Sequence, residues 1–237
     1  ALFFSCSPAE PETMVWEFES SIRALEVTAE RGIWWAGANG LVGHSMDDGA
    51  SWKVDTLRLS DGSLPAFRSI AVTNDAAFVL TIASPAVLFR RDLDGAIWDS
   101  VYVNHDPAVF FDSMVFWDDQ EGLAMGDATA ECLSVLITRD GGWQWNLLDC
   151  SKLPGVATAA SGQKEAAFAA SNGNLVVQDD EVWMASGGAA SRIFHSSDRG
   201  RSWAVANTPI VQGGAMTGMF SVARCRDDGN AGMAWGG

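Results

Sequence analysis

The sequence lacks several features that would place it in a common class of protein. It has no apolar run of 18 residues or more, so no membrane-spanning helix is predicted. It has no CxxC pair and no GxGxxG loop opening a helix after a strand, which argues against zinc, haem and dinucleotide sites. Basic residues are few (15 Lys and Arg against 30 Asp and Glu), and the net charge of −15 disfavours nucleic acid. We therefore predict no metal, no cofactor and no nucleic-acid partner.

Turn-forming and large packing residues are abundant instead. The 237 residues include 24 glycines and 11 tryptophans, and 48% of the chain is hydrophobic. Many turns joined to many bulky side chains suit several packed β-sheets better than a helical bundle. The composition also leaves enough apolar residues for a sizeable core.

One eight-residue pattern, Ser/Thr-x-Asp-x-Gly-x-x-Trp, occurs at 45–52, 138–145 and 196–203, and a degenerate copy keeps only Gly95 and Trp98. The hydroxyl and the carboxylate can accept hydrogen bonds from turn amides, and the glycine permits a positive φ. The tryptophan buries a large ring between neighbouring sheets. We therefore predict a structural role, not a catalytic one, for Ser45, Asp47, Gly49, Trp52, Thr138, Asp140, Gly142, Trp145, Ser196, Asp198, Gly200 and Trp203.

The same succession of strands surrounds each copy of the pattern. Apolar first strands are predicted at 22–27, 67–72, 112–116, 166–170 and 220–223. Four strands in about 45 to 58 residues make one propeller blade. We predict an all-β protein, a β-propeller of four-stranded antiparallel blades at about 20–58, 66–103, 110–149 and 164–206, with a further blade starting at 218–237.

A propeller closes into a ring to hide its strand edges. We expect six or seven blades in the full-length protein, of which about four and a half lie in this chain. Residues 14–19 are predicted to be an outer strand of the last blade.

Residues 1–13 are predicted to precede the propeller, which would occupy 14–237. A short apolar run ends at Cys6 and is followed by a polar linker, as at the end of a bacterial lipoprotein signal peptide. Cys6 would then be a lipid anchor, and the protein would be extracytoplasmic, in the periplasm or anchored to the outer membrane. The alternative is an ordinary terminus with a free thiol. Cys132 and Cys150 flank one predicted hairpin, so we also hypothesise a disulfide that suits an oxidising compartment.

The repeated turns resemble those of the BNR/Asp-box superfamily, which includes sialidases and the photosystem II stability/assembly factor family. The chain is most similar to bacterial relatives of that assembly factor, often labelled "oxidoreductase". Segments 67–69, 111–114, 166–172, 187–192 and 220–222 carry this resemblance. The sequence has no motif that supports redox chemistry. The acidic charge also departs from the basic patch that the resemblance implies for photosynthetic members.

Candidate site residues lie where the first strand of each blade begins, because this strand lines the central channel of a propeller. An ungapped alignment of these starts places Arg23, Arg68, Asp112, Glu165 and Phe220 in one register. Two interpretations remain open. The charges form an ion-pair network in a wet channel, or the arginines belong to a pocket that binds carboxylates.

Three other residues complete the candidate list, and two further histidines are assigned a packing role. Arg192 and Asp127 are expected at the rim of the channel, and His105 lies in a loop on the same side. His44 and His195 each precede the serine of a repeated turn, which predicts a shared packing role for them.

Two functions follow from this arrangement. The first is a non-catalytic propeller that binds a protein or glycan partner, as the assembly-factor resemblance implies. The alternative is a glycoside hydrolase of the sialidase type, in which Asp112 and Glu165 are the catalytic carboxylates. The sequence contains only one tyrosine, Tyr102, predicted on an outer strand rather than beside these acids.

Overall fold

Antiparallel sheets dominate the computed structural model, which describes residues 14–28, 32–168, 172–224 and 232–236. The first three sheets have four strands each, and each sheet is continuous in sequence. Their strands are β1 (Ile22–Thr28), β2 (Gly32–Gly37), β3 (Leu41–Ser45) and β4 (Lys53–Thr56); β5 (Phe67–Val72), β6 (Ala76–Thr81), β7 (Ala86–Asp92) and β8 (Asp99–Asn104); and β9 (Phe111–Phe116), β10 (Gly122–Gly126), β11 (Ser134–Thr138) and β12 (Asn146–Leu147).

The fourth sheet departs from this plan. β13 (Glu165–Ala166) pairs only with β16 (Gly187–Gly188), whereas β14 (Leu175–Gln178), β15 (Glu181–Ala185), β17 (Arg192–Ser196) and β18 (Ala204–Asn207) form the four-stranded sheet. The innermost strand is therefore split by an insertion. Of the strand predicted over 166–170, only Ala166 is paired among the described residues, and residues 169 and 170 lie outside them. A final pair follows, β19 (Met219–Arg224) with β20 (Gly232–Gly236).

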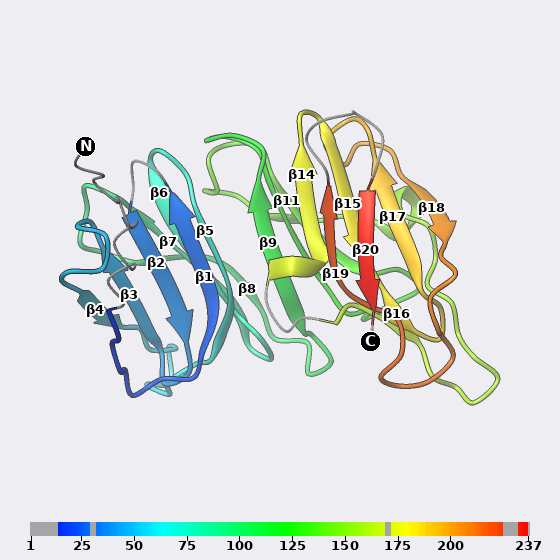
Figure 1. Ribbon diagram of the computed structural model, residues 1–237, viewed down its shortest axis with the longest axis horizontal. Helices are drawn as coiled ribbons and strands as arrows, with labels where there is room; N and C mark the ends of the chain where they lie inside the picture. Colours follow the sequence, from blue (N-terminus) through cyan, green and yellow to red (C-terminus); the bar gives the residue numbers. More distant parts are fainter. Residues whose placement is uncertain (1–13, 29–31, 169–171, 225–231, 237) are drawn as a thin grey trace, which may run out of the picture.

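The sheets follow one another around a shared axis (Figure 1). The inner strands β1, β5, β9, β14 and β19 lie in chain order, each in contact with the next. This arrangement confirms the predicted all-β propeller. In the part of the chain that the structure describes, helical structure is limited to two short 3-10 turns, η1 (Cys150–Lys152) and η2 (Asn172–Asn174), and no helix there could cross a membrane.

The hydrophobic cores lie between consecutive sheets. Trp34 of the first sheet packs in one cluster with Phe67 and Ile70 of the second, and Phe78 of the second packs in another with Met114 of the third. A third cluster joins the third and fourth sheets. Burying a large side chain in this way contributes roughly 1.5–3 kcal/mol, so each sheet is stabilised by its neighbour.

The repeated turns have the predicted hydrogen bonds. Ser196 Oγ accepts from the N–H of Gly200 (2.8 Å) and donates to Asp198 Oδ1 (2.8 Å), and that carboxylate also accepts from the N–H of Ser202 (2.8 Å). The turns at 45–52 and 138–145 repeat this pattern. Arg199 and Gly200 have φ values of 57° and 79°. Glycine is favoured at position 200 because it adopts a positive φ without a steric penalty.

His44 and His195 share the predicted packing role. The ring of His44 stacks on Trp34 at 4.4 Å between centroids, and that of His195 stacks on Trp183 at 5.0 Å. The outer strand predicted over residues 14–19 is not formed. Phe18 instead packs on Trp35 and on Trp52, the tryptophan of the first repeated turn.

Cys132 and Cys150 form the hypothesised disulfide, with their Cα atoms 5.4 Å apart. It links the segment before β11 to η1, beside the core between the third and fourth sheets. The two cysteines are 18 positions apart in sequence, and a cross-link over such a loop removes conformational freedom from the unfolded chain.

We predict that replacing both cysteines by serine lowers the free energy of unfolding by about 3 kcal/mol, measured by urea denaturation. Dithiothreitol should lower the midpoint of the wild type but leave the midpoint of the double variant unchanged. If dithiothreitol does not change the midpoint of the wild type, and mass spectrometry finds Cys132 and Cys150 as free thiols, the disulfide is contradicted.

Candidate functional site

A β-bulge recurs near the start of four inner strands. The pairing register shifts by one residue between Ile22 and Ala24, between Phe67 and Ser69, and between Met219 and Ser221. In the third sheet the shift falls between Phe111 and Ser113. The extra residues are Arg23, Arg68, Asp112 and Phe220. A bulge redirects the side chain of its extra residue, so one backbone feature turns these four side chains to the same place.

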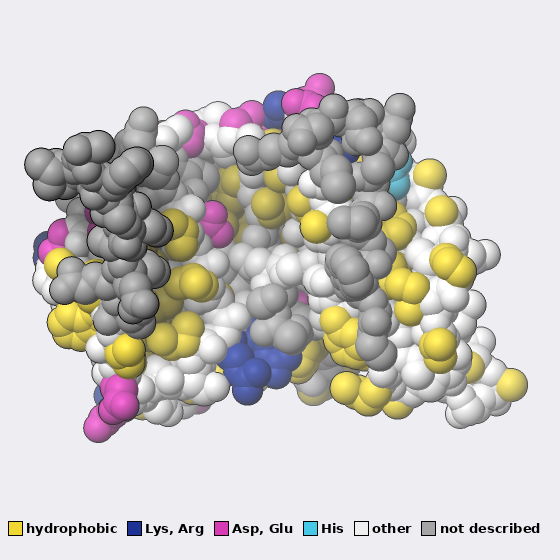
Figure 2. Space-filling model, viewed as in Figure 1, with side chains coloured by type: hydrophobic (Ala, Val, Ile, Leu, Met, Phe, Trp, Pro, Cys, Tyr) yellow, Lys and Arg dark blue, Asp and Glu magenta, His cyan; other side chains and the backbone are white. Residues whose placement is uncertain are grey.

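The four bulge residues line one cavity at the mouth of the channel, with a volume of about 370 Å³. Its other lining residues are Phe110, Asp127, Ala167, Phe168 and Met216. Figure 2 shows a hollow between the two halves of the molecule, with Lys and Arg side chains gathered at its lower edge. The structure thus brings together Arg23, Arg68, Asp112 and Asp127, four residues singled out from the sequence.

The two arginines differ in their surroundings. Arg23 is exposed, and its Nε donates to Ser21 Oγ at 3.2 Å. Arg68 is half-buried, and its guanidinium lies 5.6 Å from the centre of the Phe110 ring. A guanidinium is attracted to the face of an aromatic ring, and its planar set of N–H donors matches the geometry of a carboxylate. Asp112 lines the same cavity and is fully buried.

Asp127 follows β10 and is fixed by its main chain. Its N–H donates to the carbonyl of Phe110 (2.9 Å), and its own carbonyl accepts from Ser134 Oγ (2.7 Å). Its Oδ1 accepts from the N–H of Ala167 at 2.9 Å. Burial disfavours the ionised carboxylate and raises the pKa of Asp127 to about 6, although the Ala167 hydrogen bond opposes that shift.

The insertion in the fourth sheet joins three blades near the channel. Asn172 Oδ1 accepts from Ser69 Oγ (2.8 Å) and from the N–H of Met114 (3.3 Å), and its Nδ2 donates to the carbonyl of Ile70 (2.6 Å). These bonds tie the insertion to β5 and β9. Ala167 and Phe168, at the start of the insertion, form part of the cavity wall.

Glu165 and Arg192 do not line this cavity. Glu165 pairs in register with Gly188, so the position equivalent to Arg23 falls on Ala167, two residues further along. The ungapped alignment is therefore wrong for the fourth blade. Glu165 is 1% exposed and paired with Arg192, whose Nε lies 2.9 Å from Oε1. It also accepts from Ser186 Oγ (2.5 Å) and from the N–H of Ala157 (2.8 Å), which makes it part of a structural ion pair.

His105 is also outside the cavity. It is exposed in the loop after β8, where its carbonyl accepts from Ser84 Oγ at 3.3 Å. The predicted lipid anchor, Cys6, lies outside the described residues.

Phe110, Phe168, Met216 and Asn172 belong to the site but were not predicted from the sequence. Phe110 lies two residues before the inner strand predicted at 112–116, and this position was the one signal in the sequence. Two of the three hydrogen bonds of Asn172 span more than 100 positions in sequence, which no local pattern indicates.

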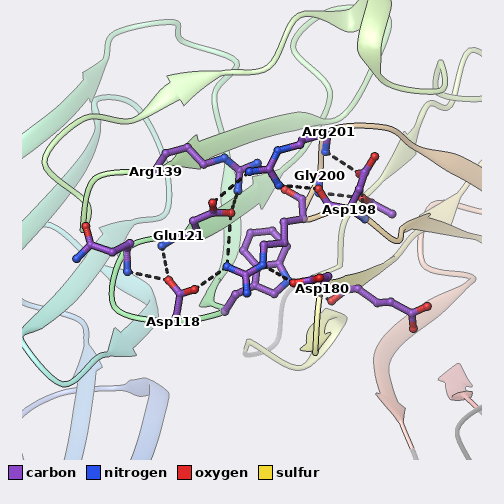
Figure 3. Close-up of polar contacts among 12 residues, drawn as sticks. Asp118, Glu121, Arg139, Asp180, Asp198, Gly200 and Arg201 are labelled. Carbon is purple, nitrogen blue, oxygen red and sulfur yellow. Dashed lines mark hydrogen bonds and ion pairs between the residues drawn. The ribbon is translucent and has the colours of Figure 1, made fainter.

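The opposite end of the strands carries a separate charge network (Figure 3). Glu121 accepts from Arg139 and from Arg201 (3.1 Å), and Arg199 bridges Asp118 (2.5 Å) and Asp180 (2.7 Å). These residues lie beside the repeated turns of the third and fourth blades. Since acids and bases alternate and pair with one another, the network stabilises the contact between the two blades.

Antiparallel sheets arranged one after another around a shared axis define the class of this chain as a β-propeller. No protein-family model and no curated protein matches it. Among solved structures, it is similar to U3-55K, with a TM-score of 0.57 and 12% identity over 81% of this chain and 53% of that one. At this identity the similarity concerns the fold.

Two further structures match over more of their length. They are "YCF48 bound to D1 peptide" (TM-score 0.45, 13% identity, 92% of this chain and 90% of that one) and YCF48 from Cyanidioschyzon merolae (TM-score 0.44, 14% identity, 92% and 93%).

We predict that Asn172→Leu lowers the free energy of unfolding by about 3 kcal/mol, because three hydrogen bonds of roughly 1 kcal/mol each are lost at a partly buried site. Urea denaturation would measure the loss. Asn146→Leu, on exposed β12, is the control and should change stability by less than about 0.5 kcal/mol. Equal effects of the two substitutions would contradict the bridging role.

We predict a pH-dependent effect of Asp127→Asn. The folded state retains the Asp127 proton up to about pH 6, whereas the unfolded chain releases it near pH 4, so this group lowers stability as pH rises between those values. The variant should gain on the order of 2 kcal/mol relative to wild type between pH 4.5 and pH 7.5. Urea denaturation at both pH values tests this, and the same difference from wild type at each would refute it.

Proposed function

We propose that this chain is a non-catalytic β-propeller that binds a protein partner through the cavity at the mouth of its channel. The observation that carries the proposal is the repeated bulge, which directs Arg23 and Arg68 from two separate blades into one cavity. Arginine forks recognise carboxylates with two parallel hydrogen bonds. The partner would present a carboxylate, with apolar groups against Phe110, Phe168 and Phe220.

Binding is favoured over hydrolysis by the position of Glu165. A hydrolase of the predicted kind needs two carboxylates facing a common substrate. Glu165 is instead held by Arg192, outside the cavity that contains Asp112.

We further infer that the repeated turns are Asp boxes of the BNR type. The shared hydrogen bonds of the turns at 45–52, 138–145 and 196–203 support this inference. We also propose that the protein works outside the cytoplasm, because disulfides persist mainly in oxidising compartments and Cys132 and Cys150 are linked.

The experiment compares two peptides, acetyl-Gly-Ala-Leu-norleucine with a free carboxyl terminus and the same peptide as its amide, by isothermal titration calorimetry. We predict that the free acid binds at least about tenfold more tightly, since a charge-assisted hydrogen bond contributes about 1.5–3 kcal/mol. Arg68→Met should remove this preference. Arg58→Met is the matched control, because Arg58 is a surface arginine that donates to Gly62.

Equal affinity for acid and amide, or no binding of either, would refute the proposed carboxylate site. If a panel of neutral oligosaccharides binds in place of the peptides, the partner is a glycan and the protein-partner proposal is wrong.

A further inference from the structure

The cavity holds charges of both signs on different walls. The arginines come from β1 and β5, and the acids come from β9 and from the segment after β10. The carboxylate of Asp127 would repel a simple anion bound in the same cavity. Charges of both signs in the cavity therefore favour a ligand that carries both an anionic and a cationic group.

Asp127, a partly buried acid of the third blade, differs from Glu165, a fully buried acid of the fourth blade. Glu165 has a guanidinium, a hydroxyl and an amide as donors. Asp127 has the Ala167 amide on Oδ1, and it forms no salt bridge within the part of the chain that the structure describes. The fold thus neutralises Glu165 with its own arginine but leaves Asp127 facing the cavity without such a partner.

The wall beside Asp127 is apolar. The N–H of Ala167 donates to the Asp127 carboxylate. The next residue, Phe168, stacks on Phe220 with the ring centroids 5.1 Å apart. Met216 lines the same cavity and is 71% exposed. An alkyl chain that ends in an ammonium can pack its methylene groups on such a wall while its charge reaches a carboxylate.

We propose that Asp127 forms a subsite for a primary ammonium group, so that the cavity selects a peptide with a lysine beside its free carboxylate. This inference rests on the proposed function, in which Arg23 and Arg68 hold the carboxylate. The lysine stem lies along Phe168 and Phe220, and its ammonium donates to the Asp127 carboxylate.

The test uses acetyl-Gly-Ala-Leu-Lys and acetyl-Gly-Ala-Leu-norleucine, both with free carboxyl termini, in calorimetric titrations of the full chain at pH 7.5. These peptides differ at the terminal residue, in the ammonium that only lysine carries. The lysine peptide should bind the wild type about tenfold more tightly than the norleucine peptide. In Asp127→Asn the ratio of the two affinities should fall to near one. Asp61→Asn, at an exposed acid that accepts from Ser63, should keep the wild-type ratio.

A second measurement separates the subsite from a general effect of charge. The charged groups that share the cavity with Asp127 are Arg23, Arg68 and Asp112. If Asp127 holds the ammonium, the preference for lysine should shrink severalfold from pH 7.5 to pH 5 in the wild type, because Asp127 takes up a proton. In Asp127→Asn it should not change over this range. Circular dichroism of each variant shows that it is folded.

The outcomes distinguish the two proposals. If the free acid is still preferred over the amide and Arg68→Met abolishes that preference, but lysine and norleucine bind the wild type equally, the ammonium subsite is refuted and the carboxylate site stands. A lysine preference that persists in Asp127→Asn also refutes the subsite. If no peptide binds, both proposals fail.

Discussion

The structure depends on the apolar contact between each sheet and the next. Inner strands carry large side chains, such as Phe67 and Met114, which pack in clusters shared with the preceding blade, and both are almost completely buried. A single four-stranded sheet cannot bury its own faces, so the blades are stable only as a series. Because the same packing recurs from blade to blade, the inner strands begin at a common level. This is the condition for forming one cavity from several blades.

The repeated turns and the cavity occupy opposite ends of the same strands. Ile22, where β1 begins, pairs with Gly37, whereas Ser45, where the first turn begins, pairs with Ile33 at the other end of β2. At the turn end, polar groups are satisfied by their neighbours. The Asp198 carboxylate is held by Ser202 and Ser196, which helps lower the pKa of Asp198 to about 2. The turn end of the strands therefore stabilises the blades, and the charged residues at the cavity end are not needed for that role.

The repeats made most of this architecture predictable from sequence. Turn chemistry is local, so Ser45, Asp47 and Gly49 could be assigned to a turn without knowledge of the rest of the chain. The bulge is also repeated with constant length, which is why an ungapped alignment placed Arg23, Arg68 and Asp112 correctly together.

The alignment failed at Glu165 because the fourth blade departs from the repeat. An alanine-rich run at 166–170 has the composition of a strand, but pairing stops at Ala166, and the insertion that follows bonds to other blades through Asn172. The partners of Asn172 are set by the way the second, third and fourth blades pack together, which is a tertiary constraint. The contact between Phe168 and Phe220 depends on the same insertion, so it could not be predicted from the sequence either.

The contrast between Glu165 and Asp127 bears on whether the cavity charges serve stability or recognition. Burying an ionised carboxylate costs free energy unless donors compensate it. The chain provides full compensation for Glu165, at a place where no ligand can reach, and only partial compensation for Asp127, which borders the cavity. An ion-pair network whose sole purpose was stability would be expected to treat both acids alike. The free-energy cost of burying the ionised Asp127 carboxylate is therefore not fully compensated within the fold. A bound cationic group would offset this cost.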